Sequence, residues 1–150
     1  MALVGKIAGQ VEIRSGGKAL HDLLRHIPND IPGMCPDKVH GCDLVSGERG
    51  VVGSTICWHY THEKKKASTQ IVESVDETNH TIRLKVIGGE LIEIYKAFTL
   101  IYHCESKDGK DWGTWTFEFE RADTSVPYPT SLMDYLCDVL KDMDAGASAK

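Results

Sequence analysis

The 150-residue sequence lacks any run of apolar residues that approaches the roughly 18 needed to cross a membrane. Its first residues also lack the h-region of about 7–15 apolar residues that a secretory signal needs, because Lys6 interrupts them. A basic excess is missing too: 17 Lys and Arg stand against 22 Asp and Glu, and phosphates would repel the resulting net charge of −5. We therefore expect an acidic, soluble, cytoplasmic protein that has no integral membrane contact and no nucleic-acid partner.

The cysteines form no recognisable covalent framework. There are five, an odd number, with no CxxC pair, and they are Cys35, Cys42, Cys57, Cys104 and Cys137. This usage is typical of reduced thiols in a cytosol. Cys57, His59 and His62 lie close enough in sequence to suggest zinc, but no second ligand pair has zinc-like spacing. We expect them to be strand-surface residues, and we predict neither a metal nor another cofactor.

Length and composition indicate one globular domain over residues 1–150. Hydrophobic residues make up 41% and charged residues 26% of the chain, near globular averages. A domain of this size can bury roughly 70% of its unfolded surface, so a core can form without disulfides. Residues 145–150 are small or polar, and we expect them to be a flexible tail.

The order of local patterns predicts an α+β fold. Alternation over 3–13 indicates a strand, Leu20, Leu23 and Leu24 indicate a short helix, and three prolines within 27–36 allow only a turn or one helical turn. Between Lys38 and Glu120, strand-like runs alternate with turn clusters at roughly 10–15-residue spacing, too short for crossover helices, so the sheet is antiparallel. A long helix begins near Thr130.

Strand alternation places many large apolar and aromatic side chains on one face of this sheet, toward the long helix. Two interpretations follow. The rings fill a solid core, which alternation alone favours, or they line a hollow that one helix leaves open. Alternation cannot detect a void, so the residue pattern leaves both open.

The combined pattern resembles the plant major latex proteins, a branch of the birch-pollen-allergen (Bet v) superfamily that includes pathogenesis-related class ten proteins. Order and spacing match from Leu3 to about Met143, nearly the whole chain. The matching segments are Leu3–Lys6, Gly50–Ser54 before Trp58 and Tyr60, Ile71–Asp76, Val86–Leu91, Tyr95–Phe98, Trp115–Glu120 and Pro129–Met133.

The resemblance implies a helix-grip fold: a seven-stranded curved antiparallel sheet around a long C-terminal helix, with two short helices at one end. It also implies a cavity for a hydrophobic or amphipathic small molecule, such as a hormone, flavonoid, sterol-like compound, fatty acid or alkaloid, and a role in plant defence or stress. Together with the inward face, it gives these expected ligand-binding residues: Ile56, Trp58, Tyr60, Gln70, Ile82, Leu84, Phe98, Leu100, Tyr102, Trp115, Phe117, Leu136 and Leu140.

Two surface segments need separate interpretation. Pathogenesis-related members carry a Gly-x-Gly-Gly-x-Gly loop, but residues 46–53 here have fewer glycines and include Glu48, which opposes an anion. We expect this loop to frame the cavity, with phosphate binding as the weaker alternative. Lys64–Lys66 is the only basic run, and we expect a solvated hairpin tip instead of an RNA or membrane patch.

No catalytic constellation is evident. Gly-x-Ser-x-Gly is absent, and the seven histidines fall mostly in turns or on outward faces. The polar exceptions on the inward face are Ser54, Ser68, Gln70 and the hydroxyls of Tyr60 and Tyr102, which can orient a ligand by hydrogen bonds. We predict no catalytic residue and a monomer or weak dimer. The alternative is an enzyme of alkaloid-type metabolism that uses the cavity for cyclisation, elimination or isomerisation. A third, weaker alternative is a purely protein-binding factor, which should have no cavity.

Overall fold

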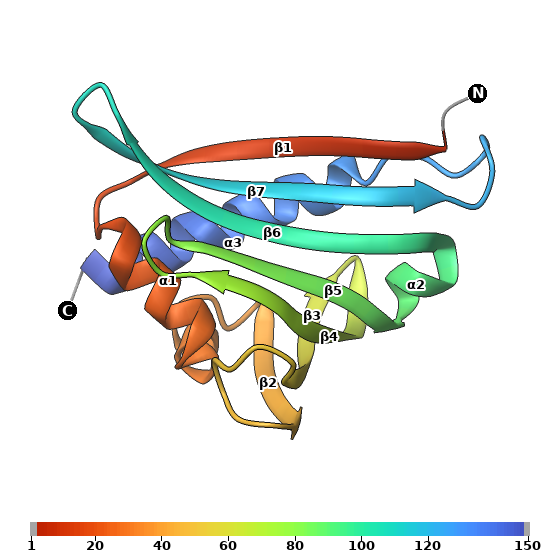
Figure 1. The fold of residues 1–150 in the computed structure, drawn as a ribbon, viewed down its shortest axis with the longest axis horizontal. Coiled ribbons are helices and arrows are strands. Elements are labelled where there is room, and N and C mark those ends of the chain that lie inside the picture. The colour runs from red at the N-terminus through yellow and green to blue at the C-terminus, as the bar shows by residue number, and fades with distance from the viewer. Residues whose placement is uncertain (1–2, 149–150) are drawn as a thin grey trace.

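The computed structural model describes residues 3–148, and it confirms the predicted fold class. Seven antiparallel strands lie in the order β1-β7-β6-β5-β4-β3-β2. The strands are β1 (Val4–Ile13), β2 (Val39–Ser46), β3 (Thr55–His62), β4 (Lys64–Asp76), β5 (Thr81–Gly89), β6 (Tyr95–Lys107) and β7 (Lys110–Arg121). The helices are α1 (Gly17–Arg25), the 3-10 helix η1 (Pro28–Gly33), α2 (Glu90–Ile94) and α3 (Thr130–Ser148). Figure 1 shows α3 crossing behind the sheet, with α1 and η1 at one end.

The sheet is curved by irregularities in its strand pairing. Register shifts occur in β2, between β4 and β5, and at the start of β6. In the β4–β5 pairing the extra residue is Ile87 of β5 at one shift and Glu73 of β4 at the other. A bulge bends its strand and increases local twist, so one bulge in β4 and one in β5 help to turn the sheet around the space that α3 crosses.

Small residues on the sheet let α3 approach the sheet closely at one side. A Cβ atom on Gly9 of β1 would lie 2.7 Å from Cys137 Sγ, and one on Gly113 of β7 would lie 2.8 Å from Leu140 Cδ2. The helix therefore sits directly on the β1–β7 side, and the remaining strands curve away from it. This asymmetry leaves space between α3 and strands β3 to β6.

Three sequence expectations need correction. Helix α3 reaches Ser148, so residues 145–148 are helical and do not belong to a flexible tail; residues 149 and 150 lie outside the described residues. Lys64–Lys66 begins β4, and the hairpin tip is Glu63, whose φ is +68°. A third short helix, α2, follows the Gly88-Gly89 pair where the sequence predicted only a turn. The physical reason for the first correction is packing, since Gly146 lies against Met34.

Candidate functional site

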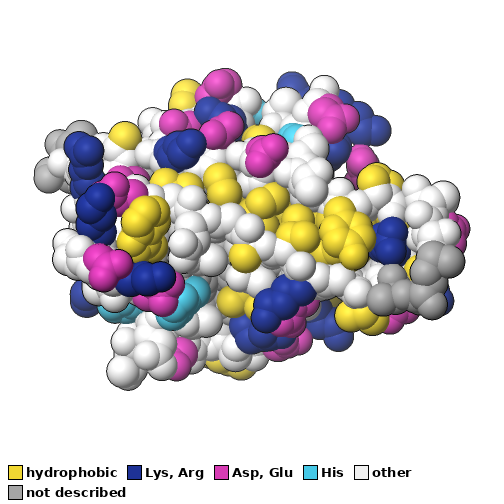
Figure 2. All heavy atoms as spheres, turned by 90° about the horizontal axis from the view of Figure 1, so that it is seen from above, with side chains coloured by type: hydrophobic (Ala, Val, Ile, Leu, Met, Phe, Trp, Pro, Cys, Tyr) yellow, Lys and Arg dark blue, Asp and Glu magenta, His cyan; other side chains and the backbone are white. Residues whose placement is uncertain are grey.

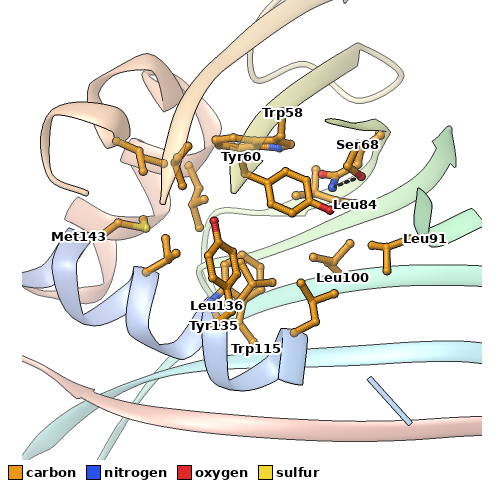
Figure 3. Close-up of a pocket in the computed structure, with 16 residues that line it drawn as sticks. Trp58, Tyr60, Ser68, Leu84, Leu91, Leu100, Trp115, Tyr135, Leu136 and Met143 are labelled. Carbon is orange, nitrogen blue, oxygen red and sulfur yellow. Dashed lines mark hydrogen bonds between the residues drawn. The ribbon is translucent and has the colours of Figure 1, made fainter. Parts of the chain in front are cut away.

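A cavity lies between the concave face of the sheet and α3. Figure 3 shows side chains from the helix and from the strands pointing toward one another across it. The space between atoms within the cavity and its open mouth is about 640 Å³.

Helix α3 supplies one wall through a single face. Leu132, Tyr135, Leu136, Val139 and Met143 line the cavity, and they recur at intervals of three and four residues. Side chains with this spacing lie on one side of an α-helix, so one amphipathic pattern builds the whole wall.

The strands supply the opposite wall by alternation. Trp58 and Tyr60 of β3 point inward, as do Ser68 and Gln70 of β4, and Leu84, Leu100 and Trp115 add one residue each from β5, β6 and β7. Within each strand the inward residues are separated by two positions, as a pleated strand requires. From the strands, two tryptophans and one tyrosine thus face the space, opposite Tyr135 of α3.

The ends of the cavity come from the short helices and the first edge of the sheet. Leu24 of α1, Ile31 of η1 and Val39 of β2 close one end, and Leu91 of α2 contributes at the other. Arg25 Nε donates a 2.9 Å hydrogen bond to the Gly50 carbonyl, which ties α1 to the β2–β3 loop. The closure therefore depends on a connection between the end of α1 and a loop 25 residues further along the chain.

The cavity lining carries no formal charge. All sixteen lining residues within the described chain are apolar or neutral polar. Burial, with a contribution from the negative charge of Glu90, raises the pKa of Tyr60 to about 12. Burial likewise raises the pKa of the Tyr135 hydroxyl, which donates a 2.6 Å hydrogen bond to the Lys38 carbonyl. Both phenols are protonated at neutral pH, so they act as hydrogen-bonding groups and not as bases.

Seven of the predicted ligand-binding residues line the cavity: Trp58, Tyr60, Gln70, Leu84, Leu100, Trp115 and Leu136. Whether they contact a ligand stays a prediction. Six others lie elsewhere. Phe98, Tyr102, Phe117 and Leu140 are at most 1% exposed and belong to the packed core, while Ile56 and Ile82 line a smaller recess near Gly50. Ring contacts explain the core positions, since Phe98 lies 5.2 Å from both Tyr95 and Phe117 between ring centroids.

Nine lining residues were not in the predicted set. They are Leu24, Ile31, Val39, Ser68, Leu91, Leu132, Tyr135, Val139 and Met143. The sequence carried a signal for several of them: Ser68 has the inward parity of Gln70, and the α3 residues share the periodicity of Leu136. Leu24, Ile31 and Leu91 had no such signal, because their position depends on how the short helices dock.

In the loop over residues 46–53, the basic side chain of Arg49 forms a hydrogen bond within the protein. Arg49 Nη2 donates a 2.6 Å hydrogen bond to the Cys42 carbonyl, and Gly50 accepts from Arg25. These contacts hold the loop against α1 and β2, but no residue of 46–53 lines the cavity, so its role as a frame of the cavity stays a prediction. Glu48 is exposed beside them, so the weaker alternative of a phosphate site gains no support.

The histidine and lysine clusters have structural partners. His59 Nε2 lies 2.8 Å from Asp43 Oδ2 on the exposed face, and no group of three metal-ligating side chains occurs within residues 3–148. Lys66 Nζ lies 3.3 Å from Glu90 Oε1, so this lysine joins β4 to α2 instead of standing in solvent. His21 departs from the expected outward placement, because it is 1% exposed.

The surface has no large region of a single charge in the view of Figure 2. Basic and acidic side chains are interspersed there, around a band of hydrophobic side chains. None of the helices described between residues 3 and 148 combines the length and apolar character of a membrane span.

Comparison with known proteins gives consistent matches. The model of the pathogenesis-related protein Bet v 1 family matches residues 2–149. The chain is 32% identical over 146 residues to MLP-like protein 43 of Arabidopsis thaliana, covering 95% of this chain and 92% of that protein. The crystal structure of ginseng major latex-like protein 151 from Panax ginseng superposes with a TM-score of 0.93 at 32% identity, covering 97% of this chain and 99% of that one.

A more distant match shows similarity of the fold alone. A point mutant of norcoclaurine synthase from Thalictrum, solved in complex with a transition-state analogue, superposes with a TM-score of 0.79 at 11% identity. It covers 99% of this chain and 97% of that one. At this identity the match carries no information on residues or activity.

Proposed function

The chain belongs to the pathogenesis-related protein Bet v 1 family, in its major latex protein branch, and from this premise we propose that it binds a hydrophobic or amphipathic small molecule in the cavity under α3. A role in plant defence or stress response, and a cytoplasmic location, form part of the same proposal. The family supports them, and the residues of the cavity do not bear on them.

One observation carries the binding proposal: apolar side chains surround empty space. A well-packed interior has few voids larger than a water molecule, so an uncharged hollow lined by leucines and aromatic rings needs a reason. A guest that enters it removes apolar surface from water at about 25 cal/mol per Å². Trp58 of β3 and Trp115 of β7 both line this hollow and offer aromatic rings to such a guest.

The enzymatic alternative gains no support from the lining. General acid–base catalysis needs a titratable group within reach of the substrate and with a pKa near neutrality. The cavity within the described residues offers only phenols as titratable groups, and burial moves the pKa of Tyr60 away from neutrality. Binding is therefore the function that this geometry favours.

A titration with N-phenyl-1-naphthylamine tests the proposal. This probe is neutral and apolar, and its emission rises when it leaves water. We expect a saturable rise with one site per chain. Leu100→Trp should abolish it, because Leu100 lines the cavity and the indole would fill the space.

The matched control is Ile101→Trp. Ile101 is the next residue of β6 and points to the opposite face of the sheet, where it pairs with Arg83 and Thr116. The control variant should bind the probe as the wild type does, and both variants should unfold cooperatively. Equal binding by the two tryptophan variants, or no saturation by the wild type, would contradict the proposal.

A further inference from the structure

Two fully buried polar atoms face the cavity without a partner, and they lie on different strands. Trp115 of β7 is 3% exposed and Gln70 of β4 is 4% exposed. Within residues 3–148, neither the indole Nε1 of Trp115 nor the amide Oε1 of Gln70 has a hydrogen-bond partner. Buried polar atoms are rarely left unpaired in folded proteins, so each of these atoms has to be completed by water or by a guest.

Two other polar groups of the lining are already engaged. The hydroxyl of Ser68 accepts a 3.1 Å hydrogen bond from Gln70 Nε2, drawn as a dashed line in Figure 3. The hydroxyl of Tyr135 donates to the Lys38 carbonyl.

The hydroxyl of Tyr60 and the indole Nε1 of Trp58 also line the cavity without a hydrogen-bond partner within residues 3–148, but they are not among the fully buried unpartnered atoms. The fully buried unpartnered atoms of the lining within residues 3–148 are one donor, Trp115 Nε1, and one acceptor, Gln70 Oε1.

These two atoms stand at separate places along the sheet. Strands β7 and β4 are separated by β6 and β5, which is three strand spacings. At about 4.8 Å per spacing, their backbones lie on the order of 14 Å apart along the sheet, and curvature brings the inward side chains closer. A guest that meets both atoms needs a polar group at each end and an apolar body between them.

The absence of charge in the cavity lining adds a further requirement, which is that the guest be neutral. A carboxylate that enters the cavity loses its hydration and meets no Lys, Arg or His among the lining residues of the described chain. An unpaired charge in an apolar environment costs far more than a neutral polar group. Charged guests are therefore disfavoured relative to neutral ones of the same shape.

We propose that the cavity selects neutral, elongated apolar molecules that carry a hydrogen-bond acceptor at the Trp115 end and a hydroxyl donor at the Gln70 end. This inference rests on the proposed binding function and narrows its ligand class. Among the classes that the family resemblance suggests, it favours neutral hydroxylated compounds over fatty acids, which are charged at neutral pH. A guest that displaces water from either atom and does not replace its hydrogen bond loses affinity.

Three matched probes separate these requirements by isothermal titration at pH 7. The first, 6-methoxy-2-naphthol, has an ether acceptor and a hydroxyl donor at opposite ends; 2-methoxynaphthalene lacks the donor; 6-methoxy-2-naphthoate carries a charge in place of the hydroxyl. We expect the naphthol to bind about 3–10-fold more tightly than 2-methoxynaphthalene, as one neutral hydrogen bond provides, and at least about 30-fold more tightly than the naphthoate.

Two variants test which protein atom makes each hydrogen bond to the probe. Trp115→Phe keeps a ring and removes the Nε1 donor, so it should weaken the binding of 6-methoxy-2-naphthol and of 2-methoxynaphthalene about 3–10-fold. Gln70→Met keeps the side-chain length and removes the amide, so it should erase the preference for the naphthol over 2-methoxynaphthalene. Thr116→Val and Thr69→Val, each the next residue on the outward face of the same strands, should change neither preference.

The outcomes distinguish the two proposals. If all three probes bind the wild type equally, or if the naphthoate binds most tightly, the inference fails while the binding function stands. If Trp115→Phe and Gln70→Met bind as the wild type does, the assigned contacts are wrong. If no probe binds the wild type at all, the binding function fails, and the inference fails with it.

Discussion

The hydroxyl of Tyr135 donates a 2.6 Å hydrogen bond to the backbone carbonyl of Lys38, which joins the first half of α3 to the segment before β2. Two neighbouring contacts reinforce this connection. Lys38 Nζ pairs with Asp142 Oδ2 at 2.7 Å, and the ring of His62 lies 4.9 Å from that of Tyr135 between centroids. Because Tyr135 also lines the cavity, this seam closes the side between α3 and the β2 edge of the sheet.

Loosening this seam should speed ligand exchange. Tyr135→Phe keeps the ring and removes the hydroxyl, so we expect faster association and dissociation of N-phenyl-1-naphthylamine in stopped-flow fluorescence. The lost hydrogen bond should lower the free energy of unfolding by about 1 kcal/mol. Tyr128→Phe, at an exposed tyrosine outside the cavity lining, is the control. Unchanged exchange rates in Tyr135→Phe would show that guests enter elsewhere.

Acid should destabilise the protein through His21. This imidazole is 1% exposed, neither ring nitrogen has a partner within residues 3–148, and His80 lies 5.7 Å away between ring centroids. Burial, and then the charges of His80 and Arg25, lower the pKa of His21 below its ordinary 6.5, while Asp22 and Glu77 act in the opposite sense. The unfolded state therefore binds the proton more readily, and stability present above pH 6.5 is lost as the pH falls below it.

The measurement is the free energy of unfolding by urea between pH 7.5 and pH 5. We expect wild-type stability to decline by up to about 1.4 kcal/mol per pH unit from this one group. His21→Leu should flatten the decline, and His26→Gln, at an exposed histidine of the same segment, should not. His62, whose pKa burial also lowers, contributes in the same direction, so some slope remains in His21→Leu. Parallel curves for wild type and His21→Leu would contradict the assignment.

Removing the carboxylate of Asp144 should lower the free energy of unfolding more than removing an exposed carboxylate of the same helix. Its side chain is 9% exposed and accepts hydrogen bonds from Arg14 N, Ser15 N and Ser15 Oγ, at 2.6 to 3.1 Å. These bonds fasten the C-terminal half of α3 to the turn between β1 and α1. Asp144→Ala leaves part-buried donors unpaired and removes bonds to a charged acceptor, and we expect it to lower the free energy of unfolding by about 3 kcal/mol.

Asp138→Ala, on the exposed side of the same helix, should cost less than about 0.5 kcal/mol. Urea denaturation of both variants at one pH decides the comparison. A similar loss for the two would mean that the Asp144 bonds exist in the structure without stabilising it.

Replacing a leucine by alanine should lower the free energy of unfolding more in the packed core than in the cavity wall. Leu140 is fully buried in the core, and Leu136 lines the cavity. Leu140→Ala creates a new void and should cost about 2–5 kcal/mol, whereas Leu136→Ala enlarges an existing space next to fewer contacts and should cost less. Thermal and urea unfolding test this order. The reverse order would contradict the assignment of Leu140 to the packed core and of Leu136 to the cavity wall.

Strand parity could predict which face of the sheet each side chain occupies, and it placed Trp58, Leu84, Leu100 and Trp115 on the cavity side. It could not predict whether an inward side chain lines the cavity or lies in the packed core. Phe98 and Phe117 have the inward parity, but they lie where aromatic rings from β6 and β7 stack on one another. Tyr102 meets Trp115 edge-on at 5.6 Å, and it is Trp115 that reaches the cavity.

The remaining lining residues depend on tertiary docking. Leu24 and Ile31 are apolar residues of short helices, and nothing in their local pattern distinguishes a cavity contact from a core contact. Their place follows from links such as Arg25 to Gly50, which tie α1 to the distant β2–β3 loop. The void itself follows from the bulges of β4 and β5 and from the close approach of α3 at Gly9 and Gly113, none of which alternation reveals.

A crystal structure of the protein with N-phenyl-1-naphthylamine is the most direct test of the cavity as a binding site. We predict density for the probe between α3 and strands β3 to β7, in contact with Trp58, Trp115 and Leu136 and without disruption of the sheet. Density only on the outer surface, with the lining side chains collapsed onto one another, would contradict the account.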